Sequence, residues 1–298
     1  MLREKLHFNT FLQKPITFFK TTKMGEILWY NACTNVESII KMKYYVVADI
    51  HSYYEPLKNA LIEKGFFDDK EPHKLIVCGD LFDRGIEACA VQAFIADLLE
   101  KNQAVLIRGN HEDLTLDLLH SWDSHSYFFS HHISNGTVST VLQLTGENET
   151  RLKLCPEQIL KKMQDTVFMK NIIPAMVDYY ETEHYIFVHG WIPCRLFKVN
   201  NNAFRYEAIE NWRESSFDEW NISRWTNGMD AAYNGILDCK KTIVCGHWHC
   251  SFGHSRFEGK GSELGKDADF SPYYAKGIIA IDACTAISRK INCLVIDD

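Results

Sequence analysis

Short apolar runs alternate with longer amphipathic stretches along the chain from residue 43 onward. Runs of four or five β-branched, aromatic or aliphatic residues are typical of buried strands, and three occur at Tyr44–Ala48, Leu75–Cys78 and Ala104–Ile107. The stretches between them, Glu55–Lys64 and Ile86–Glu100, place apolar residues at helical spacing and predict helices. Because the strand ends recur about 30 residues apart, the length of a βαβ unit, we predict parallel strands joined by right-handed crossovers.

The later part of the chain adds a helical segment and further strands. Residues 113–183 are predicted to be mostly helical, with the polar aromatic stretch His125–His132 left unassigned. Strands are expected again at Tyr185–Val188, Thr242–Cys245, Gly277–Ile281 and Cys293–Ile296, with an aromatic-rich segment, Glu210–Tyr233, among them. Because no repeat or linker divides the sequence, residues 43–298 are predicted to form one elaborated α/β domain with a helical insertion at about 113–183.

Residues 1–42 differ from the rest in composition. They carry six Lys or Arg residues against three Glu, and four Phe side chains make them too apolar for a solvated tail. They lack the apolar core of a signal peptide, and no helical or strand periodicity persists in them. We expect an N-terminal extension, and the residues leave two interpretations open: an accessory segment, or sequence that precedes a natural start at Met42.

Composition narrows the class of protein. Of the 298 residues, 46% are hydrophobic and 24% are charged, as in ordinary soluble globular proteins, and no apolar run is long enough to predict a membrane span. The formal net charge of −7 argues against non-specific nucleic-acid binding, which needs a basic surface. The ten cysteines form no C-x-x-C pair and follow no secretory signal, so we expect a reduced, cytoplasmic protein without nucleic-acid or membrane partners.

Candidate ligands follow the ends of five predicted strands. The five clusters are Asp49-Ile50-His51, Gly79-Asp80-Leu81-Phe82-Asp83-Arg84-Gly85, Gly109-Asn110-His111-Glu112, His189-Gly190 and Gly246-His247-Trp248-His249. Taken singly, each has an ordinary structural explanation: Asp49 can cap a helix, and Asp83 with Arg84 can form an ion pair in a turn. Because ligands of open α/β sheets gather at the carboxyl ends of strands, all five clusters together favour one metal site.

The order of these motifs resembles that of the calcineurin-like metallophosphoesterases. Asp-x-His, Gly-Asp-x-x-Asp-Arg-Gly, Gly-Asn-His-Glu, Val-His-Gly and Gly-His-x-His follow one another between Tyr44 and about Ile296. The Asp-Arg-Gly and Gly-Asn-His-Glu forms are similar to the phosphoprotein phosphatase branch, including its bacterial serine/threonine phosphatases. The resemblance implies an α/β fold in which a β-sandwich is flanked by helices, four layers in all.

The resemblance also implies two divalent metal ions as cofactors. Carried over position by position, the ligands would be Asp49, His51 and His249 for the first metal, Asn110, His189 and His247 for the second, and Asp80 as the bridge. Mixed imidazole, carboxylate and amide ligands suit Mn²⁺, our first expectation, with Fe or Zn²⁺ as the alternatives. Two such metals can bring a bridging water towards hydroxide at neutral pH and polarise a phosphoryl oxygen.

Three neighbours of the ligands would complete the catalytic machinery. By resemblance, His111 would act as general acid for the leaving alkoxide, and Asp83 would pair with His111 and favour its charged form. Arg84 offers a planar fork that suits two phosphate oxygens, and Asn110 lies beside it in the substrate phosphate site. Arg224 is a candidate second phosphate clamp, with packing over a tryptophan as its alternative role.

Some positions depart from the family pattern or fall outside it. Ser52 stands where the family usually has glycine after Asp-x-His, which is less comfortable for a turn that needs a positive φ. His189 is followed by Gly190-Trp191, where the family often has Ala-Gly or Gly-Gly. Neither change removes a ligand. The remaining histidines are expected to be ordinary loop residues: His125, His131, His132 and His254.

These residues together predict an enzyme, a metal-dependent hydrolase of phosphate monoesters. The first expected substrate is phosphoserine or phosphothreonine in a phosphorylated protein, and a small phosphoester is the other class of partner. A symmetrical dinucleoside tetraphosphate hydrolase is the alternative, because those related enzymes share most motifs; Asp83 favours the phosphatase, whereas the Trp-rich segment suits a nucleotide pocket. A non-catalytic, metal-dependent phosphate-binding module is a remote alternative, disfavoured because every ligand position is filled.

Overall fold

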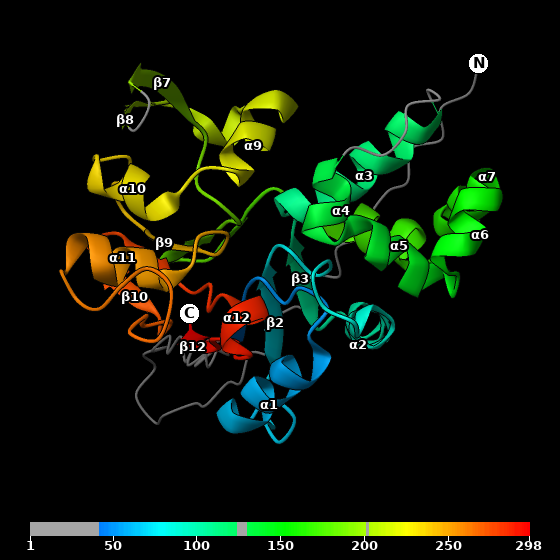
Figure 1. Cartoon of the computed structure of the whole chain (residues 1–298). Helices are drawn as coiled ribbons and strands as arrows, with labels where there is room; N and C mark the ends of the chain where they lie inside the picture. The colour runs from blue at the N-terminus through cyan, green and yellow to red at the C-terminus, as the bar shows by residue number, and fades with distance from the viewer. Residues whose placement is uncertain (1–41, 124–129, 201–202) are drawn as a thin grey trace, which may run out of the picture. The chain divides into compact units, whose positions relative to one another are not determined.

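The computed structural model describes residues 42–123, 130–200 and 203–298. The predictions for residues 1–41 and for His125 lie outside these ranges. Two five-stranded sheets lie at the centre of the described chain, and helices cover them (Figure 1). The mixed α/β architecture predicted from the sequence is confirmed.

The first sheet contains the βαβ units predicted from the apolar runs. Its strand order is β12-β1-β2-β3-β4, formed by Leu294–Asp297, Lys43–Val47, His73–Cys78, Ala104–Ile107 and Met176–Val177. Strands β1, β2 and β3 pair in parallel, as predicted; β4, in the segment predicted to be mostly helical, pairs in parallel with β3, and β12 adds an antiparallel edge. The carboxyl ends of β1, β2 and β3 therefore lie side by side.

The second sheet brings the later motifs into the same region. Its order is β10-β11-β9-β6-β5, formed by Tyr273–Ala275, Ile278–Ala280, Thr242–Cys245, Tyr185–Phe187 and Tyr180–Glu181. Strands β6, β9 and β11 are parallel, and each of the two edge strands is antiparallel to its neighbour. The segments that follow β6 and β9 carry the His189 and His247 motifs.

Alternation along the strands explains why the two sheets pack face to face. On β1, Tyr44 and Val46 contact Phe187 and Val244 of the second sheet in one apolar cluster, whereas Tyr45 packs on the opposite side against helices. Strands buried on both faces need apolar residues at every position, which is why the sequence shows unbroken apolar runs rather than strict alternation. The result is the predicted sandwich with helices outside both sheets.

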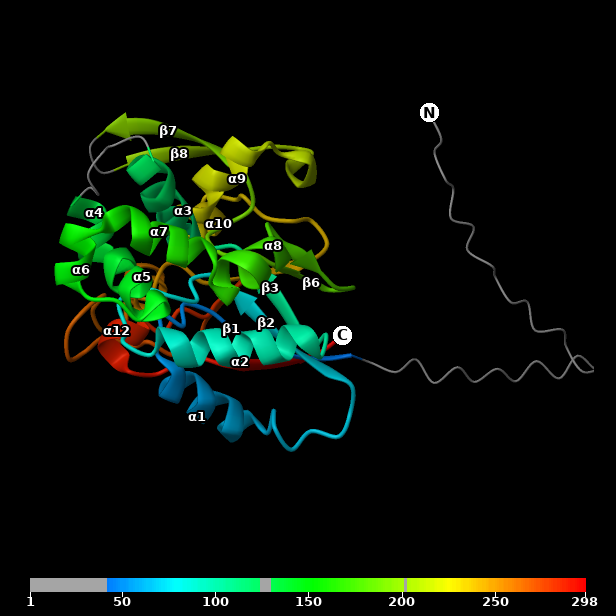
Figure 2. The ribbon, with the colours of Figure 1, turned by 90° about the vertical axis from the view of Figure 1, so that its right-hand side faces the viewer.

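The outer layers are helical. On the first sheet lie α1 (Tyr54–Lys64) and α2 (Ala88–Glu100) (Figure 2). The helices of residues 110–175 pack around α2 and on one another, and their bounds are Asn110–Asp123 (α3), Ser130–Asn135 (α4), Thr137–Thr145 (α5), Glu149–Leu154 (α6), Pro156–Gln164 (α7) and Ile173–Ala175 (α8), the last preceded by a π-helical turn at Phe168–Ile172. On the second sheet lie Phe217–Arg224 (α9), Gly228–Tyr233 (α10) and Cys250–Phe257 (α11). A short helix, Thr285–Ser288 (α12), precedes β12.

Two parts of the fold differ from the sequence prediction. The antiparallel ribbon of β7 (Cys194–Asn200) and β8 (Ala203–Ala208) was not predicted, because its residues show no long apolar run. The aromatic-rich segment forms α9 and α10, with Trp212 and Trp220 buried against the second sheet. Within the described ranges the cysteines are all free, and no helix there is both long and apolar enough to cross a membrane.

Candidate metal centre

The loops that follow the strands adopt an unusual backbone conformation. Seven non-glycine residues there have φ between +50° and +73°: Asp49, His51, Ser52, Asp80, Asp83, Arg84 and His247. A left-handed conformation costs a non-glycine residue about 1–2 kcal/mol, so its repetition in loops that carry candidate ligands marks them as functional. The positive φ of Ser52 explains why the family usually has glycine at this position.

Two glycines allow the candidate carboxylates to lie against the backbone. A Cβ atom on Gly109 would lie 2.1 Å from the Asp80 Oδ1 atom, and a Cβ atom on Gly246 would lie 2.2 Å from the Asp49 Oδ2 atom. Both distances are shorter than any non-bonded contact. Any other residue at these two positions would displace a carboxylate.

Asp80 lies between two groups of histidines, as expected for a bridging ligand. Its Oδ1 atom is 3.3 Å from the His189 Nε2 atom, and its Oδ2 atom is 3.8 Å from the His51 Nε2 atom. His247 joins the His189 side, with the candidate ligand atoms of Asp80, His189 and His247 all within 4.8 Å of one another. The Asn110 Oδ1 atom is 2.7 Å from the His189 Nε2 atom.

Backbone carbonyls orient two of the imidazoles towards this centre. The Nδ1–H group of His51 donates to the carbonyl of Phe82 at 2.9 Å, and that of His189 donates to the carbonyl of Cys78 at 2.8 Å. Because a carbonyl can only accept, each ring carries its proton on Nδ1 and presents a lone pair on Nε2. Such an outer hydrogen bond is usual for histidines that bind metals.

Burial sets the charge state of these groups. Burial and, to a smaller extent, repulsion from neighbouring histidines lower the pKa of His51 well below its usual value and the pKa of His247 to about 3. Burial and, to a smaller extent, repulsion from the nearby carboxylates of Asp282 and Asp80 raise the pKa of Asp49. Neutral imidazoles beside uncompensated buried carboxylates fit a site that binds cations, because a cation would stabilise the carboxylates.

His249 is not brought together with Asp80 and its three histidines. Its Nε2 atom lies 3.0 Å from the Glu263 Oε1 atom, and its ring stacks on Trp248. Asp49 lies closer to the centre, since its Oδ1 atom is 3.9 Å from the His51 Nε2 atom and its Oδ2 atom accepts the backbone N–H of His247. To bind a metal through its Nε2 atom, His249 would therefore have to break its contact with Glu263.

A buried pair of side chains adjoins the metal ligands. The Nδ1 atom of His111 lies 2.7 Å from the Asp83 Oδ2 atom. The hydroxyls of Thr137 and Thr140, both on α5, donate to the two oxygens of the same carboxylate at 2.8 and 2.7 Å. The helical insertion thus holds Asp83, and Asp83 orients His111.

Electrostatics favour the charged form of His111. Burial acts against a charge on its imidazole, but the Asp80 and Asp83 carboxylates outweigh burial and raise the pKa of His111 above its usual value. The exposed Arg84 places its Nη2 atom 3.3 Å from the His111 Nε2 atom. A cationic fork open to solvent therefore lies directly beside the Nε2 atom of His111.

Arg224 does not lie in a comparable position. Only 3% of Arg224 is exposed, and its guanidinium pairs with Asp178 and, at 2.9 Å, with the Oδ2 atom of Asp113. Asp113 also accepts from Arg108, so the two arginines share one carboxylate. This network favours a structural role for Arg224 and Arg108, rather than the phosphate-clamp role that was a candidate for Arg224.

Two carboxylates near the centre were missed by the sequence analysis. Glu112, which received no role of its own there, accepts the backbone N–H groups of Asp80, Leu81 and Gly109 at 3.1, 2.9 and 2.8 Å and so connects two ligand loops. Asp282 follows β11 and is buried near Asp49, and burial raises its pKa to about 6. Its place just after a strand was the available signal.

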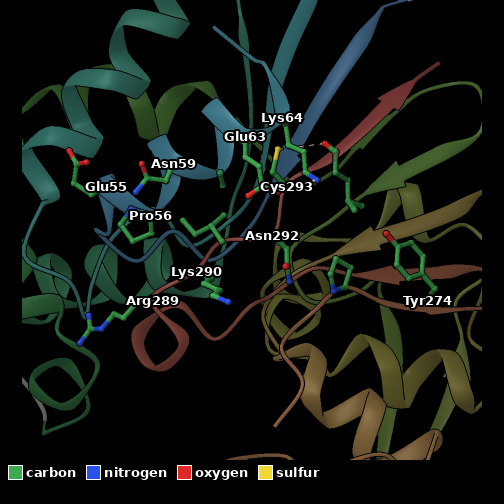
Figure 3. Close-up of a pocket in the computed structure, with 14 residues that line it drawn as sticks. Glu55, Pro56, Asn59, Glu63, Lys64, Tyr274, Arg289, Lys290, Asn292 and Cys293 are labelled. Atoms are coloured by element: carbon green, nitrogen blue, oxygen red, sulfur yellow. Dashed lines mark hydrogen bonds and ion pairs between the residues drawn. The ribbon is translucent and has the colours of Figure 1, made fainter. Parts of the chain in front are cut away.

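A separate cavity of about 710 Å³ lies between α1 and the segment that leads into β12 (Figure 3). Its lining mixes charges, with Glu55 and Glu63 from α1 and with Arg289 and Lys290 from the segment before β12. None of the predicted metal ligands is among the described residues that line it. This cavity is therefore not part of the candidate metal centre.

Known proteins show where the chain belongs. Three solved structures are similar to it. A candidate diadenosine tetraphosphatase is 13% identical with a TM-score of 0.42, and the match covers 87% of this chain and 90% of that one. A serine/threonine phosphatase from Saccharomyces cerevisiae (14% identity, TM-score 0.36, coverage 71% of this chain and 62% of that one) and a metallophosphoesterase from Sphaerobacter thermophilus (12% identity, TM-score 0.35, coverage 70% and 60%) are also similar. TM-scores below 0.5 carry no weight for the substrate, and no curated protein matches the chain. The family model for calcineurin-like phosphoesterases, however, matches residues 42–251, more than half of the sequence. The chain therefore belongs to the calcineurin-like phosphoesterase family, whose members are hydrolases with a dinuclear metal site.

Proposed function

We propose that the protein is a metal-dependent phosphomonoesterase that removes phosphate from phosphoserine or phosphothreonine in proteins. Residues 43–298 would form a single catalytic domain, with residues 113–183 as an insertion that supports the site. The observation that carries the proposal is the buried contact between His111 and Asp83, because an alkoxide leaving group of a monoester needs a proton.

His111 is the proposed general acid. Its Nδ1–H group stays with Asp83, and its Nε2 atom is the one that faces Arg84 and the Asp80 side of the centre. In this structure the Arg84 guanidinium, which can only donate, faces the Nε2 atom. Once a bound phosphate takes up the guanidinium, Nε2 can carry a proton and pass it to a leaving oxygen while the hydrogen bond to Asp83 is kept. Asp83 fixes the orientation of the ring and stabilises its positive charge.

Arg84 is the proposed phosphate-binding residue. Its guanidinium is exposed and lies 3.3 Å from the imidazole of His111, so two oxygens of a phosphate held by this fork would lie beside the acid. Asn110, at the start of α3, would contact the same group. Arg224 is not proposed for this role, because its guanidinium already pairs with two carboxylates.

Seven positions would hold two divalent metals: Asp49, His51, Asp80, Asn110, His189, His247 and, after its release from Glu263, His249. The donor set of imidazole nitrogens with carboxylate and amide oxygens fits Mn²⁺, and also Fe or Zn²⁺. When bound, two such ions activate water and polarise a phosphoryl oxygen. A reduced, cytoplasmic location is proposed with this function, on the grounds of cysteine usage.

A substrate panel tests the proposal. Protein loaded with Mn²⁺ would be assayed on a phosphoserine peptide, diadenosine tetraphosphate and a phosphodiester, with His111→Asn as the matched variant. We expect the highest kcat/KM on the phosphopeptide and a loss of about 10²–10⁴-fold in the variant. Turnover of the tetraphosphate alone would overturn the assignment of the substrate.

One observation favours a second candidate, hydrolysis of a dinucleoside polyphosphate. Trp225 is 47% exposed, and its ring lies 6.0 Å from that of His247, a proposed ligand. An exposed indole beside a metal centre offers a face on which a base can stack, worth about 1–3 kcal/mol. Trp225→Ala should then lower kcat/KM for the tetraphosphate and leave the phosphopeptide unaffected. Equal effects on both substrates would remove this support.

A further inference from the structure

Three side chains outside the dinuclear centre converge where α3 meets α4. The Asp117 Oδ2 atom lies 3.0 Å from the His132 Nε2 atom and 3.6 Å from the His131 Nε2 atom. The candidate ligand atoms of all three lie within 4.8 Å of one another. Two imidazole nitrogens thus approach a single carboxylate oxygen.

This convergence is unusual for the helix that carries the histidines. Neighbouring residues of an α-helix point about 100° apart and do not normally face each other. The rings of His131 and His132 nevertheless lie 4.1 Å apart at an angle of 53°, both directed at Asp117. Ordinary loop histidines, as expected from the sequence, would not share one acceptor in this way.

The distances match those of a transition-metal site. A tetrahedral Zn²⁺ ion with bonds of about 2.0–2.1 Å separates its ligand atoms by roughly 3.3 Å. The two nitrogen–oxygen distances, 3.0 and 3.6 Å, lie on either side of that value. Burial, followed by the neighbouring His131, lowers the pKa of His132, which favours the neutral imidazole that binds metals.

The cluster is partly open to solvent. The His132 side chain is fully buried, whereas the side chains of His131 and Asp117 are 46% and 51% exposed. Three protein ligands with an accessible fourth position are typical of zinc sites that also bind water or a ligand. Two of the three ligands are therefore accessible to a dissolved cation.

The position of the cluster connects it with the catalytic loops. Asp117 follows Asn110 by seven residues on α3, which places it two turns, or about 10 Å, along the helix axis from the dinuclear centre. Helix α5 begins five residues after His132 and holds Asp83 through Thr137. A metal here would fix α4 to α3 and support the element that positions Asp83.

We propose that Asp117, His131 and His132 bind a third divalent transition-metal ion of the Zn²⁺ class, separate from the dinuclear centre. Another cluster of comparable spacing, Glu183 with His184 and Asp298, contributes a single imidazole. Because imidazole nitrogen suits Zn²⁺ and this second cluster offers one imidazole where the first offers two, it serves as a matched control.

Metal content tests the proposal without reference to turnover. The full chain and three variants, His131→Gln, Asp117→Asn and His184→Gln, would be saturated with Zn²⁺, desalted and analysed for zinc per chain. We expect His131→Gln and Asp117→Asn to hold one equivalent less than the parent chain, and His184→Gln to hold the same amount. Both test positions are half-exposed, so their substitution should leave the thermal midpoint of the metal-free chain unchanged.

Two results would overturn the proposal. One is equal zinc content in the parent chain, His131→Gln and Asp117→Asn. The other is an equal loss in His184→Gln, which would indicate adventitious surface binding. Co²⁺ provides a spectroscopic check: the difference spectrum between the parent chain and His131→Gln should contain the d–d bands of a tetrahedral nitrogen–oxygen site, and a featureless difference would count against it.

Discussion

Replacement of Asp83 by asparagine tests the acid hypothesis most directly. The carboxylate is buried and accepts from three side chains: His111 at 2.7 Å, Thr137 at 2.8 Å and Thr140 at 2.7 Å. Asparagine keeps the shape but removes the negative charge that stabilises the protonated imidazole. The amide oxygen can take the place of Oδ2 and accept from His111 and Thr137, while the amide NH2 group can donate to the hydroxyl oxygen of Thr140, so the loop should keep its conformation.

The expected loss follows from the contact that is weakened. A hydrogen bond to a charged group contributes about 1.5–3 kcal/mol. Because the step begins from the protonated imidazole, loss of this stabilisation lowers the fraction of His111 that carries a proton and thereby lowers kcat by up to roughly 10- to 160-fold, at 1.36 kcal/mol for each factor of ten. The effect should be smaller than that of His111→Asn, because the imidazole itself remains.

The assay compares two substrates with different leaving groups, and it compares the effect of Asp83→Asn in the parent chain with its effect in the His111→Asn variant. Rates for Asp83→Asn would be measured on a phosphoserine peptide and on p-nitrophenyl phosphate, whose leaving group needs no proton, with metal content and thermal midpoint as controls. Because Asp83 is a positioning residue that acts through His111, Asp83→Asn should have no further effect in the His111→Asn background. A similar loss in both backgrounds, or equal losses on both substrates, would refute the reasoning.

Four further outcomes are expected. Asp80→Asn should lose both metals of the dinuclear centre together, as measured by metal analysis, because its two oxygens face different histidine groups; two retained equivalents would contradict this. Ser52→Gly should raise the free energy of unfolding by about 1 kcal/mol in urea titrations, because it relieves a positive φ and removes a buried hydroxyl that has no hydrogen-bond partner in the described structure. Asp69→Asn should lower the urea midpoint at pH 7, because the Lys43 and Tyr45 hydrogen bonds stabilise the charged Asp69 carboxyl and hold its pKa well below its usual range. The difference in midpoint between the parent chain and the variant should shrink as the pH falls below about 4, since this stabilisation disappears as the native carboxyl is protonated. A difference that stays constant down to pH 3 would count against this prediction. A chain that begins at Met42 should keep its metals and turnover, since every proposed ligand follows Lys43; lost turnover in a folded, metal-loaded chain would show that the extension reaches the site.

The regular part of the fold was predictable from local pattern. The runs at Tyr44–Ala48, Leu75–Cys78 and Ala104–Ile107 became β1, β2 and β3 with shifts of at most two residues, since strands buried on both faces require unbroken apolar sequence. The later strands were confirmed for the same reason. Because the parallel strands of one sheet end at one edge, the meeting of the His189 and His247 motifs in the second sheet was also predictable, whereas their meeting with Asp80 of the first sheet rested on the resemblance to the family.

The surroundings of the site depend on contacts that local pattern does not encode. Thr137 and Thr140 reach Asp83 across 54 and 57 residues, and nothing in the sequence of α5 marks them as supporting residues. The pairing of His249 with Glu263 likewise joins a strand-end motif to an irregular loop. Such contacts are decided by tertiary packing, so a motif identifies the ligand but not its partner.

The left-handed residues of the ligand loops limit how far this protein can be stabilised. Seven positions at about 1–2 kcal/mol each amount to roughly 7–14 kcal/mol, as much as the whole folding free energy of a typical domain. Backbone preference alone would select glycine at all seven, whereas chemistry requires carboxylate, imidazole or guanidinium at six of them. A selection for heat resistance without activity should therefore accumulate glycines in these loops and erase the site. Ser52 is the one position of the seven where glycine would relieve the backbone without removing a side chain that the chemistry requires.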